Sequence, residues 1–347
     1  MQSTKMTTRQ LTVQFNTPAF LGDAQQQGSW RTPPFKSLLR QWWRVAWAAK
    51  NQFSNDIDQL HKDEASLFGS VMGESSKQSQ VRIRLDSWQK GKLTSWPKLQ
   101  TVRVGNENMK VDSGLYLGFG PIAFSGEKQQ PILKNKAAIN VGESATFGLA
   151  YPQSQSDLLE TALSLMNSYG TIGGRSRNGW GSFSFISQDD SVPIQEISQA
   201  VIRPWRDALK LDWPHALASD EHGSLIWQTE VFDDWRSVMH RLAEIKIGLR
   251  TQFKFQSAMA SSKPEERHWL SYPVTHHKVT DWGNKRLPNS LRFKVRIDDS
   301  GSLKGVIFHV PCLPPQEFEP DRTAIESVWT RVHDFLDNDS HLTRIAK

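Results

Sequence analysis

The segment 169–183, which reads YGTIGGRSRNGWGSF, has the composition of an anion-binding loop. It holds five glycines and two arginines and lacks acidic residues. Glycine lets another backbone approach closely, and backbone N–H groups with guanidinium side chains together suit phosphate oxygens. The pattern predicts a phosphate site at Gly173, Gly174, Arg175 and Arg177. The alternative is a glycine-rich hairpin with solvated arginines.

Two common nucleotide-binding loops do not fit this segment. No Gly-Lys-Ser/Thr follows the glycines, which excludes a Walker loop. The alternation of Trp180, Phe183 and Phe185 indicates that a strand leaves the loop, whereas a dinucleotide-binding loop leads into a helix. The remaining functions are contact with a sugar–phosphate backbone or with another protein.

A second basic surface is predicted on a helix that begins after the Thr-Pro-Pro sequence at 32–34, where the hydroxyl suits a cap and the prolines suit the first turn. An apolar stripe follows at helical spacing: Phe35, Leu38, Leu39, Trp42, Trp43, Ala46 and Trp47. Beside it Lys36, Arg40 and Arg44 recur at every fourth position. Like charges at this spacing repel one another, so we expect the ridge to meet an anion. A solvated face is the alternative.

Histidines in the second half raise the question of catalysis. His268, His276 and His277 gather near Lys278 and Lys285, a set that suits RNA cleavage by general acid–base catalysis. Phosphate contact or an ordinary surface position is the favoured interpretation. Because carboxylates at ligand spacing do not accompany them, the sequence predicts no metal site and no cofactor.

Composition points to a polyanionic partner. The 347 residues carry a net charge of +6, and 31–50 holds five basic residues and no acidic one. Clustered positive charge on a globular protein is typical of nucleic-acid binding. The single cysteine, Cys312, excludes an intrachain disulfide. A polar N-terminus and the lack of a long apolar run predict a cytoplasmic protein without a membrane span.

Hydrophobic periodicity predicts similar element orders in the two halves. In the first half we expect strands and helices at 11–15, 35–47 (helix), 56–68 (helix), 81–85, 145–149, 156–168 (helix) and 183–185. In the second half we expect them at 224–231, 233–250 (helix), 269–274, 291–297, 306–310 and 321–336 (helix). The predicted class is α+β, with two ferredoxin-like (RRM-like, βαββαβ) domains with insertions, at 1–190 and 191–347.

Several motifs in order resemble one protein family. Phe20-Leu21-Gly22 is followed by RTPPFKSLLRQWWR at 31–44, by LFG at 67–69 and by IGGRSRNGWG at 172–181. Together they resemble the RAMP superfamily and, within it, the subunit numbered one of the Cmr (type III-B) CRISPR effector complex. The resemblance covers residues 17–183 well and the rest loosely. LPNSLR at 287–292 is similar to a late motif of that family, with the proline absent from its equivalent place.

The resemblance implies two ferredoxin-like domains and a non-catalytic RNA-binding subunit. Its partners would be CRISPR guide RNA, target RNA or both, and other RAMP subunits, in antiviral defence. The RNA-binding residues would be Arg31, Lys36, Arg40, Arg44, Gly173, Gly174, Arg175 and Arg177. We expect Trp30, Trp43 or Trp180 to stack on a base. Two alternatives stay open: a Cas6-like, metal-independent CRISPR RNA-processing endoribonuclease that uses the His276–His277 pair, and a scaffold that grips acidic protein surfaces.

Overall fold

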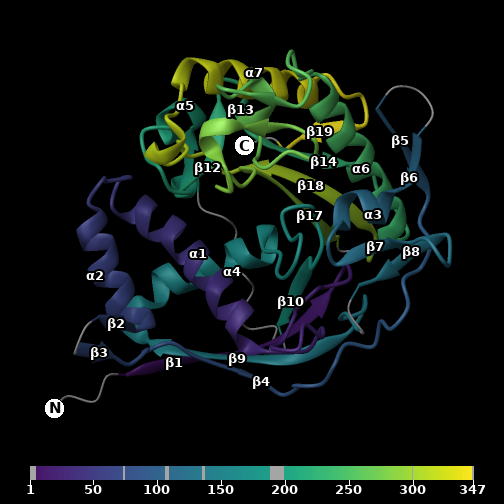
Figure 1. The fold of residues 1–347 in the computed structure, drawn as a ribbon. Coiled ribbons are helices and arrows are strands. Elements are labelled where there is room, and N and C mark those ends of the chain that lie inside the picture. The colour runs from purple at the N-terminus through teal and green to yellow at the C-terminus, as the bar shows by residue number, and fades with distance from the viewer. Residues whose placement is uncertain are drawn as a thin grey trace. The chain divides into compact units, whose positions relative to one another are not determined.

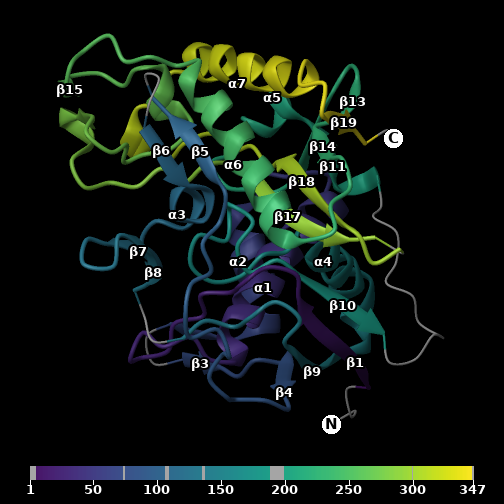
Figure 2. The same ribbon diagram turned by 90° about the vertical axis from the view of Figure 1, so that its right-hand side faces the viewer.

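The computed structural model describes residues 5–72, 75–105, 109–134, 137–187, 199–298 and 300–345. The chain forms two compact units (Figures 1 and 2). Unit 1 comprises Met1–Lys98, Gly118–Val201 and Lys294–Gly301, and unit 2 comprises Leu99–Leu117, Ile202–Phe293 and Ser302–Lys347. The predicted boundary between residues 190 and 191 lies outside the described residues, so a division at that point stays a prediction.

Unit 1 is built on a four-stranded antiparallel sheet in the order β10-β1-β9-β4. Its strands are β1 (Met6–Phe15), β4 (Arg82–Leu85), β9 (Ser144–Pro152) and β10 (Phe183–Ser187). Val13 of β1 lies opposite Ala145 and Phe185 on the two flanking strands. Leu11, Val13 and Phe15 are buried, as their alternation with polar residues predicts.

Helices α1 (Thr32–Lys50) and α4 (Ser156–Tyr169) pack together on one face of this sheet (Figure 1). The N-cap of α1 is Arg31, without a side-chain hydrogen bond, so the expected capping role of Thr32 is wrong. The prolines do occupy the first turn, where the absence of an N–H costs nothing. The shorter helix α2 (Ile57–Phe68) is capped by Asp56, whose carboxylate accepts the Gln59 N–H, and ends at Gly69.

Insertions in unit 1 form two hairpins. One pairs β2 (Ser70–Met72) with β3 (Ser75–Lys77), and the other pairs β7 (Ile122–Ser125) with β8 (Gln130–Leu133). Single 3₁₀ turns lie at Gln153–Gln155 and Gln199–Val201.

A second four-stranded sheet has the order β17-β18-β14-β19 and belongs to unit 2 except for residues 294–297 of β17, which are part of unit 1. The elements along the chain are β14 (Ile226–Thr229), α6 (Trp235–Thr251), β17 (Leu291–Ile297), β18 (Leu303–His309), α7 (Arg322–Asp337) and β19 (Leu342–Arg344). In each sheet, the first of the four principal strands along the chain lies inside the sheet and not at its edge. The chain therefore crosses over between strands that are not neighbours in the sequence. The mixed α+β class is confirmed.

Smaller elements complete unit 2. They are β5 (Thr101–Val104), β6 (Met109–Asp112), α3 (Ser113–Gly118), β11 (Ile202–Pro204), α5 (Trp205–Ala208), β12 (Leu217–Asp220), β13 (Gly223–Ser224), β15 (Ala260–Ser261), β16 (Lys278–Val279) and 3₁₀ turns at Glu266–Trp269, Thr280–Trp282 and Gln316–Phe318. The strand predicted at 269–274 is wrong: only isolated bridges form there, at Tyr272 and Val274. Pro273 lies between them and has no N–H to extend a ladder.

Candidate nucleic-acid interface

The glycine-rich loop joins α4 to β10 and is closed at its base. Thr171 forms an isolated antiparallel β-bridge with Ser182, and the Ile172 N–H donates to the Gly181 carbonyl at 3.0 Å. Within the loop, the N–H groups of Asn178 and Gly179 donate to the carbonyls of Arg175 and Ser176. The segment therefore holds one compact shape through its own backbone bonds.

Three of the glycines pack closely against the Pro18–Leu21 backbone. The Gly174 N–H donates to the Phe20 carbonyl at 3.0 Å, and the Gly181 N–H donates to the Pro18 carbonyl at 2.9 Å. At Gly173, where φ is +93°, a Cβ would lie 2.8 Å from the Phe20 oxygen. The expectation that these glycines open a cradle of N–H groups is thus corrected for Gly174 and Gly181, because those donors are used within the protein.

Aromatic rings fill the space beneath the loop. Trp180 lies 5.6 Å from Phe20 and 5.3 Å from Trp96, measured between ring centroids, and is 0% exposed. Trp43 of α1 is 1% exposed and packs on Phe68 at 5.6 Å. Trp30 is also buried. The expectation that one of these three tryptophans stacks on a base is wrong, since their rings belong to the core of unit 1.

Arg175 places a cation at the rim of the loop. Its φ of +58° is in the left-handed region, and its guanidinium Nε donates to the Phe119 carbonyl at 2.6 Å. The side chain therefore lies over the turn at Gly120, where a Cβ would be 3.6 Å from Nη2. Arg177, two residues on, is half-buried. The Arg175 side chain is exposed, so phosphate can reach its guanidinium.

The segment 18–22 connects the loop to the start of α1. The Arg31 guanidinium Nη1 donates to the Gly22 carbonyl at 2.7 Å, while Gly174 and Gly181 bond to carbonyls of the same segment. The sequence motifs at 20–22, 31–44 and 172–181 therefore meet in one part of unit 1.

The predicted basic ridge on α1 is partly neutralised by Glu64 of α2. The Arg44 Nε and Nη2 each donate to this carboxylate at 2.8 Å, and the Arg40 Nε also donates to it. Burial opposes ionisation of Glu64, but hydrogen bonds from Arg44 and Arg40 outweigh it and lower its pKa. The premise that the ridge is uncompensated is wrong, because two of its three cations share this carboxylate.

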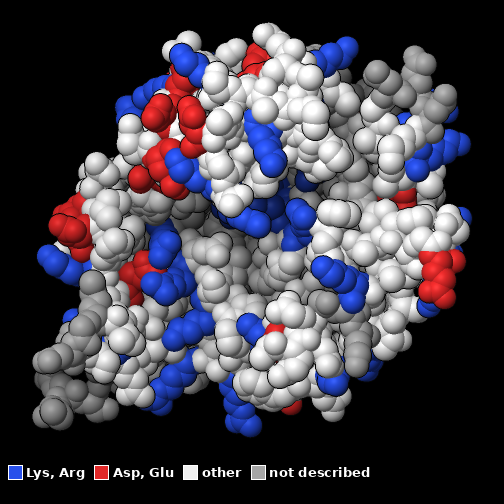
Figure 3. Space-filling view, viewed as in Figure 1, with Lys and Arg blue, Asp and Glu red and all other residues white. Residues whose placement is uncertain are grey.

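The ridge still has an excess of positive charge. The Lys36 Nζ donates to the Phe68 carbonyl at 3.3 Å, and burial, then the charge of Arg40, lowers the Lys36 pKa. Lys and Arg side chains gather over the region of α1 and α2 in the space-filling view (Figure 3). Glu64 lies on the buried face of α2 with Leu60 and Leu67, a spacing that marks its position on the helix but does not identify its partners.

We expect Glu64→Gln to destabilise unit 1 by about 1–3 kcal/mol, because two arginines lose the counter-charge they share. Their side chains are 46% and 37% exposed, so water screens them and the cost stays below that of a fully buried pair. Urea unfolding followed by tryptophan fluorescence measures the change. Glu127→Gln, in the exposed β7–β8 turn, removes the same charge as a control. Equal effects of the two variants would contradict the role of Glu64.

Two histidines of unit 2, His268 and His277, form a closed hydrogen-bond circuit with Ser257 and Glu265. The Glu265 N–H donates to His268 Nδ1 at 2.9 Å, and His268 Nε2 lies 3.1 Å from His277 Nδ1. His277 Nε2 lies 3.1 Å from Ser257 Oγ, which donates to the Glu265 carboxylate. Burial lowers the His268 pKa to about 4, so its ring is neutral with the proton on Nε2. His277 then donates to Ser257 and does not act as a base toward it.

The His276–His277 pair does not form a common site. His277 is buried and stacks on Phe255 with ring centroids 3.7 Å apart, whereas His276 is exposed. The Lys285 Nζ donates to the Glu317 carbonyl at 2.6 Å. The arrangement therefore does not assemble His268, His276 and His277 around a substrate.

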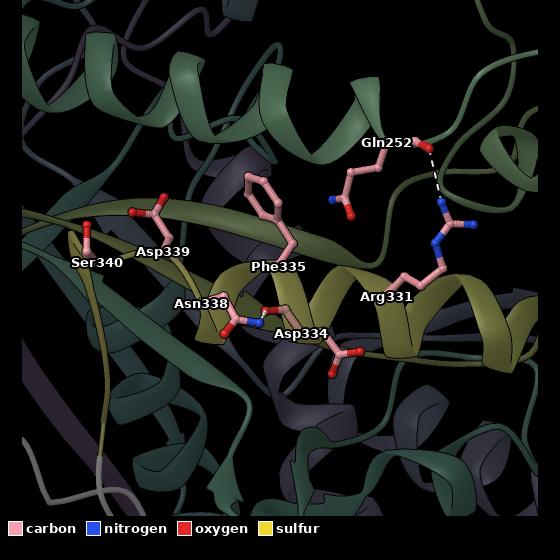
Figure 4. Close-up of a pocket in the computed structure, with 7 residues that line it drawn as sticks. All are labelled: Gln252, Arg331, Asp334, Phe335, Asn338, Asp339 and Ser340. Carbon is pink, nitrogen blue, oxygen red and sulfur yellow. Dashed lines mark hydrogen bonds between the residues drawn. The ribbon is translucent and has the colours of Figure 1, made fainter.

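Two cavities lie apart from the predicted phosphate-binding residues. One in unit 2, of about 540 Å³, is lined by residues of α7 and by Gln252, whose carbonyl accepts from Arg331 (Figure 4). The other, in unit 1, is about 440 Å³ and includes Trp30 and Glu143. Among the described residues, no cluster of three or more His, Cys, Asp or Glu is arranged to hold a metal ion. In the same residues, no helix is both long and apolar enough to cross a lipid bilayer.

Structural comparison finds a crystal structure of Cmr1 from Pyrococcus furiosus in its apo form, with 16% identity, a TM-score of 0.48, and coverage of 97% of this chain and 98% of that one. It also finds a type III-B Cmr-beta cryo-EM structure bound to cognate target RNA and AMPPnP in the presence of ssDNA (12% identity, TM-score 0.45, 95% and 100% coverage). A third, bound to cognate target RNA, has 13% identity, a TM-score of 0.45, and 94% and 99% coverage.

The sequence matches no curated protein. A family model, described as the RAMP superfamily, matches residues 12–184. That range contains the last four residues of β1, all of α1 and the glycine-rich loop. The helix and the loop carry the predicted resemblance. Through residues 12–184, this chain belongs to the RAMP superfamily.

Proposed function

We propose that the protein is a non-catalytic RNA-binding subunit of a type III-B CRISPR ribonucleoprotein effector complex. It contacts guide RNA, target RNA or both through the backbone toward the guide 3′ end, assembles with other RAMP subunits, and acts in antiviral defence in the cytoplasm. The observation that carries the proposal is the RAMP match over a loop with an exposed arginine, Arg175, at its rim.

Both units are proposed to be ferredoxin-like domains. In unit 1 the support is the order β10-β1-β9-β4, the fourth, first, third and second of its principal strands, with α1 after the first and α4 after the third. In unit 2 the order β17-β18-β14-β19 keeps the first strand, β14, inside the sheet, with α6 after it and α7 after β18. RNA-recognition domains share the ferredoxin-like plan. In RNA-recognition domains, aromatic rings stack on bases. Here we assign that role to exposed aromatic rings, because Trp30, Trp43 and Trp180 are buried.

Phosphate contacts are assigned to Arg31, Lys36, Arg40, Arg44, Arg175 and Arg177. The first four lie on or beside α1 and the last two on the loop, and the segment 18–22 holds both regions in contact. Backbone contacts position RNA without reading its sequence. We therefore expect weak sequence preference and a strong salt dependence of binding.

We expect Arg175→Gln to weaken RNA binding about fivefold near 0.1 M salt and to reduce the slope of log K against log salt by about 0.7, the value for one phosphate contact to a single strand. Fluorescence anisotropy with short RNA at several salt concentrations measures both quantities. Arg82→Gln, on the edge strand β4, is the matched control because β4 and β10 lie at opposite edges of the sheet. An unchanged slope for Arg175→Gln would remove this residue from the interface.

The non-catalytic assignment is supported by the burial of His268 and His277 and by their closed hydrogen-bond circuit. Incubation of the purified protein with repeat RNA in EDTA tests it. Intact RNA is the expected result, whereas cleavage that His276→Ala abolishes would favour the ribonuclease alternative.

A further inference from the structure

One aromatic ring of unit 1 is exposed beside the loop. Phe119 is 65% exposed, although phenylalanine side chains are normally buried. It lies in the turn between α3 and β7, a segment that the sequence motifs do not include. Packing in the core does not cover a ring this exposed, so its face is open to a ligand.

The backbone of Phe119 is fixed against Arg175. Its carbonyl accepts from the Arg175 Nε at 2.6 Å, and the next residue, Gly120, donates its N–H to the Ile122 carbonyl at 3.1 Å. Pro121 packs on Gly174, where a Cβ would approach Pro121 Cγ to 3.0 Å. The ring therefore stands on a backbone that is already ordered, which lowers the entropy cost of binding to it.

Exposed positive charge exceeds exposed negative charge on Arg175 and on the chain segment that follows this ring. Arg175 is adjacent, and the β7–β8 hairpin (Figure 2) and the residue after it carry exposed Lys128 and Lys134 against exposed Glu127. An aromatic face next to a guanidinium matches the base and the phosphate of a single-stranded nucleic acid. The excess of cations favours RNA over an apolar protein surface as the occupant.

We propose that Phe119 stacks on an unpaired base of the bound RNA, next to a phosphate contacted by Arg175. The inference rests on the proposed RNA-binding function and adds a residue that neither the family motifs nor the buried tryptophans provide. Stacking tolerates any base, which agrees with weak sequence preference.

The test uses the full chain and a short oligoadenylate that carries 2-aminopurine, whose fluorescence falls when the base is stacked. We expect Phe119→Ala to weaken binding about 5- to 100-fold, the range for loss of one base–aromatic stack, and to abolish the quenching. The salt slope should stay unchanged, because no phosphate contact is removed. Phe119→Trp should restore both affinity and quenching.

Phe124→Ala is the matched control, since Phe124 is a second exposed phenylalanine, 54% exposed on β7, and lies further along the chain from the backbone that Arg175 holds. Wild-type affinity and quenching in Phe119→Ala, with a reduced salt slope in Arg175→Gln, would overturn the stacking role and leave the proposed function intact. Failure of the wild-type chain to bind RNA would overturn both. If Phe119→Ala instead disrupts assembly with a RAMP partner and leaves RNA affinity unchanged, the ring is a protein contact and the inference is wrong.

Discussion

Replacing Gly181 by alanine is expected to destabilise unit 1 by about 3 kcal/mol or more, as local strain and a backbone clash add. Gly181 has a φ of +66°, and a Cβ there would lie 1.9 Å from the Ile172 carbonyl oxygen. The backbone has little room to relieve this clash. The Gly181 N–H donates a hydrogen bond to the Pro18 carbonyl, and the Gly181 carbonyl accepts one from the Ile172 N–H.

Two other glycines of unit 1 separate the effect of backbone strain from the effect of the Cβ clash. Gly142 has a φ of +79°, but a Cβ there would meet open space, so alanine should cost only the conformational strain, about 1–2 kcal/mol. Gly126 has open space and no left-handed φ, so its alanine variant should be nearly neutral. Urea unfolding of the three variants measures the series. Similar losses of unfolding free energy for Gly181→Ala and Gly142→Ala would contradict a cost from close packing at the base of the glycine-rich loop.

The elements with strong periodicity were predictable from the sequence. The apolar stripe of α1 and the alternation of β17 reflect burial of one face, which spacing reports directly. The strand at 291–297 is observed as Leu291–Ile297, and the helix expected at 35–47 is observed as Thr32–Lys50. The extra residues at the ends of α1 include its prolines and Lys50, which the apolar pattern does not mark.

Pairwise contacts between distant elements were not predictable. Arg40 and Arg44 show as a ridge in the sequence, but the carboxylate that pairs with them comes from another helix, and helix spacing says nothing about that neighbour. Likewise, the residue type of Trp180 fits a stacking platform or a core, and only its contacts with Phe20 and Trp96 decide between them.

The glycine-rich loop shows the same ambiguity at the level of the backbone. Glycines suit both an anion cradle and close packing, because each needs a position without a side chain. The N–H groups of Gly174 and Gly181 donate to carbonyls of the segment 18–22, so part of the motif serves the fold, and Arg175 is the phosphate contact that we propose. A phosphate-binding hypothesis from glycine content alone therefore overstates the number of backbone contacts.

Acid is expected to destabilise unit 2 by several kcal/mol between about pH 7 and pH 5, through histidines that are buried in their neutral form. Burial lowers the pKa of His215 and His268 to about 4 and that of His333 to about 3, and it lowers the pKa of His309 well below its ordinary value of 6.5. The unfolded chain binds these protons near pH 6.5, whereas the folded chain does not. Stability is therefore complete above that pH and is lost as the pH falls toward the folded values.

The geometry explains why these rings resist protonation. His333 Nε2 faces His309 Nδ1 at 3.0 Å, and His309 Nε2 lies 2.9 Å from Ser290 Oγ. If either imidazole became charged, its positive charge would be buried without water, and protonation of both rings would place two protons between them. Trp329 stacks on His309 with centroids 4.2 Å apart and covers one face of that ring. A histidine whose folded pKa is about 4 or lower, as for His215, His268 and His333, contributes about 2 kcal/mol of lost stability at about pH 5.

Denaturant unfolding at a series of pH values measures this loss, and His333→Gln should reduce it by about 2 kcal/mol, since glutamine keeps a polar group and does not titrate. His61→Gln is the control, because His61 is exposed in unit 1 and its replacement should leave the acid sensitivity unchanged. An identical pH dependence in wild type and His333→Gln would refute the buried-histidine explanation. The expected result also bears on catalysis: imidazoles that are buried in their neutral form are poor candidates for proton exchange with a substrate. This is consistent with the binding role that we propose for α1 and the glycine-rich loop.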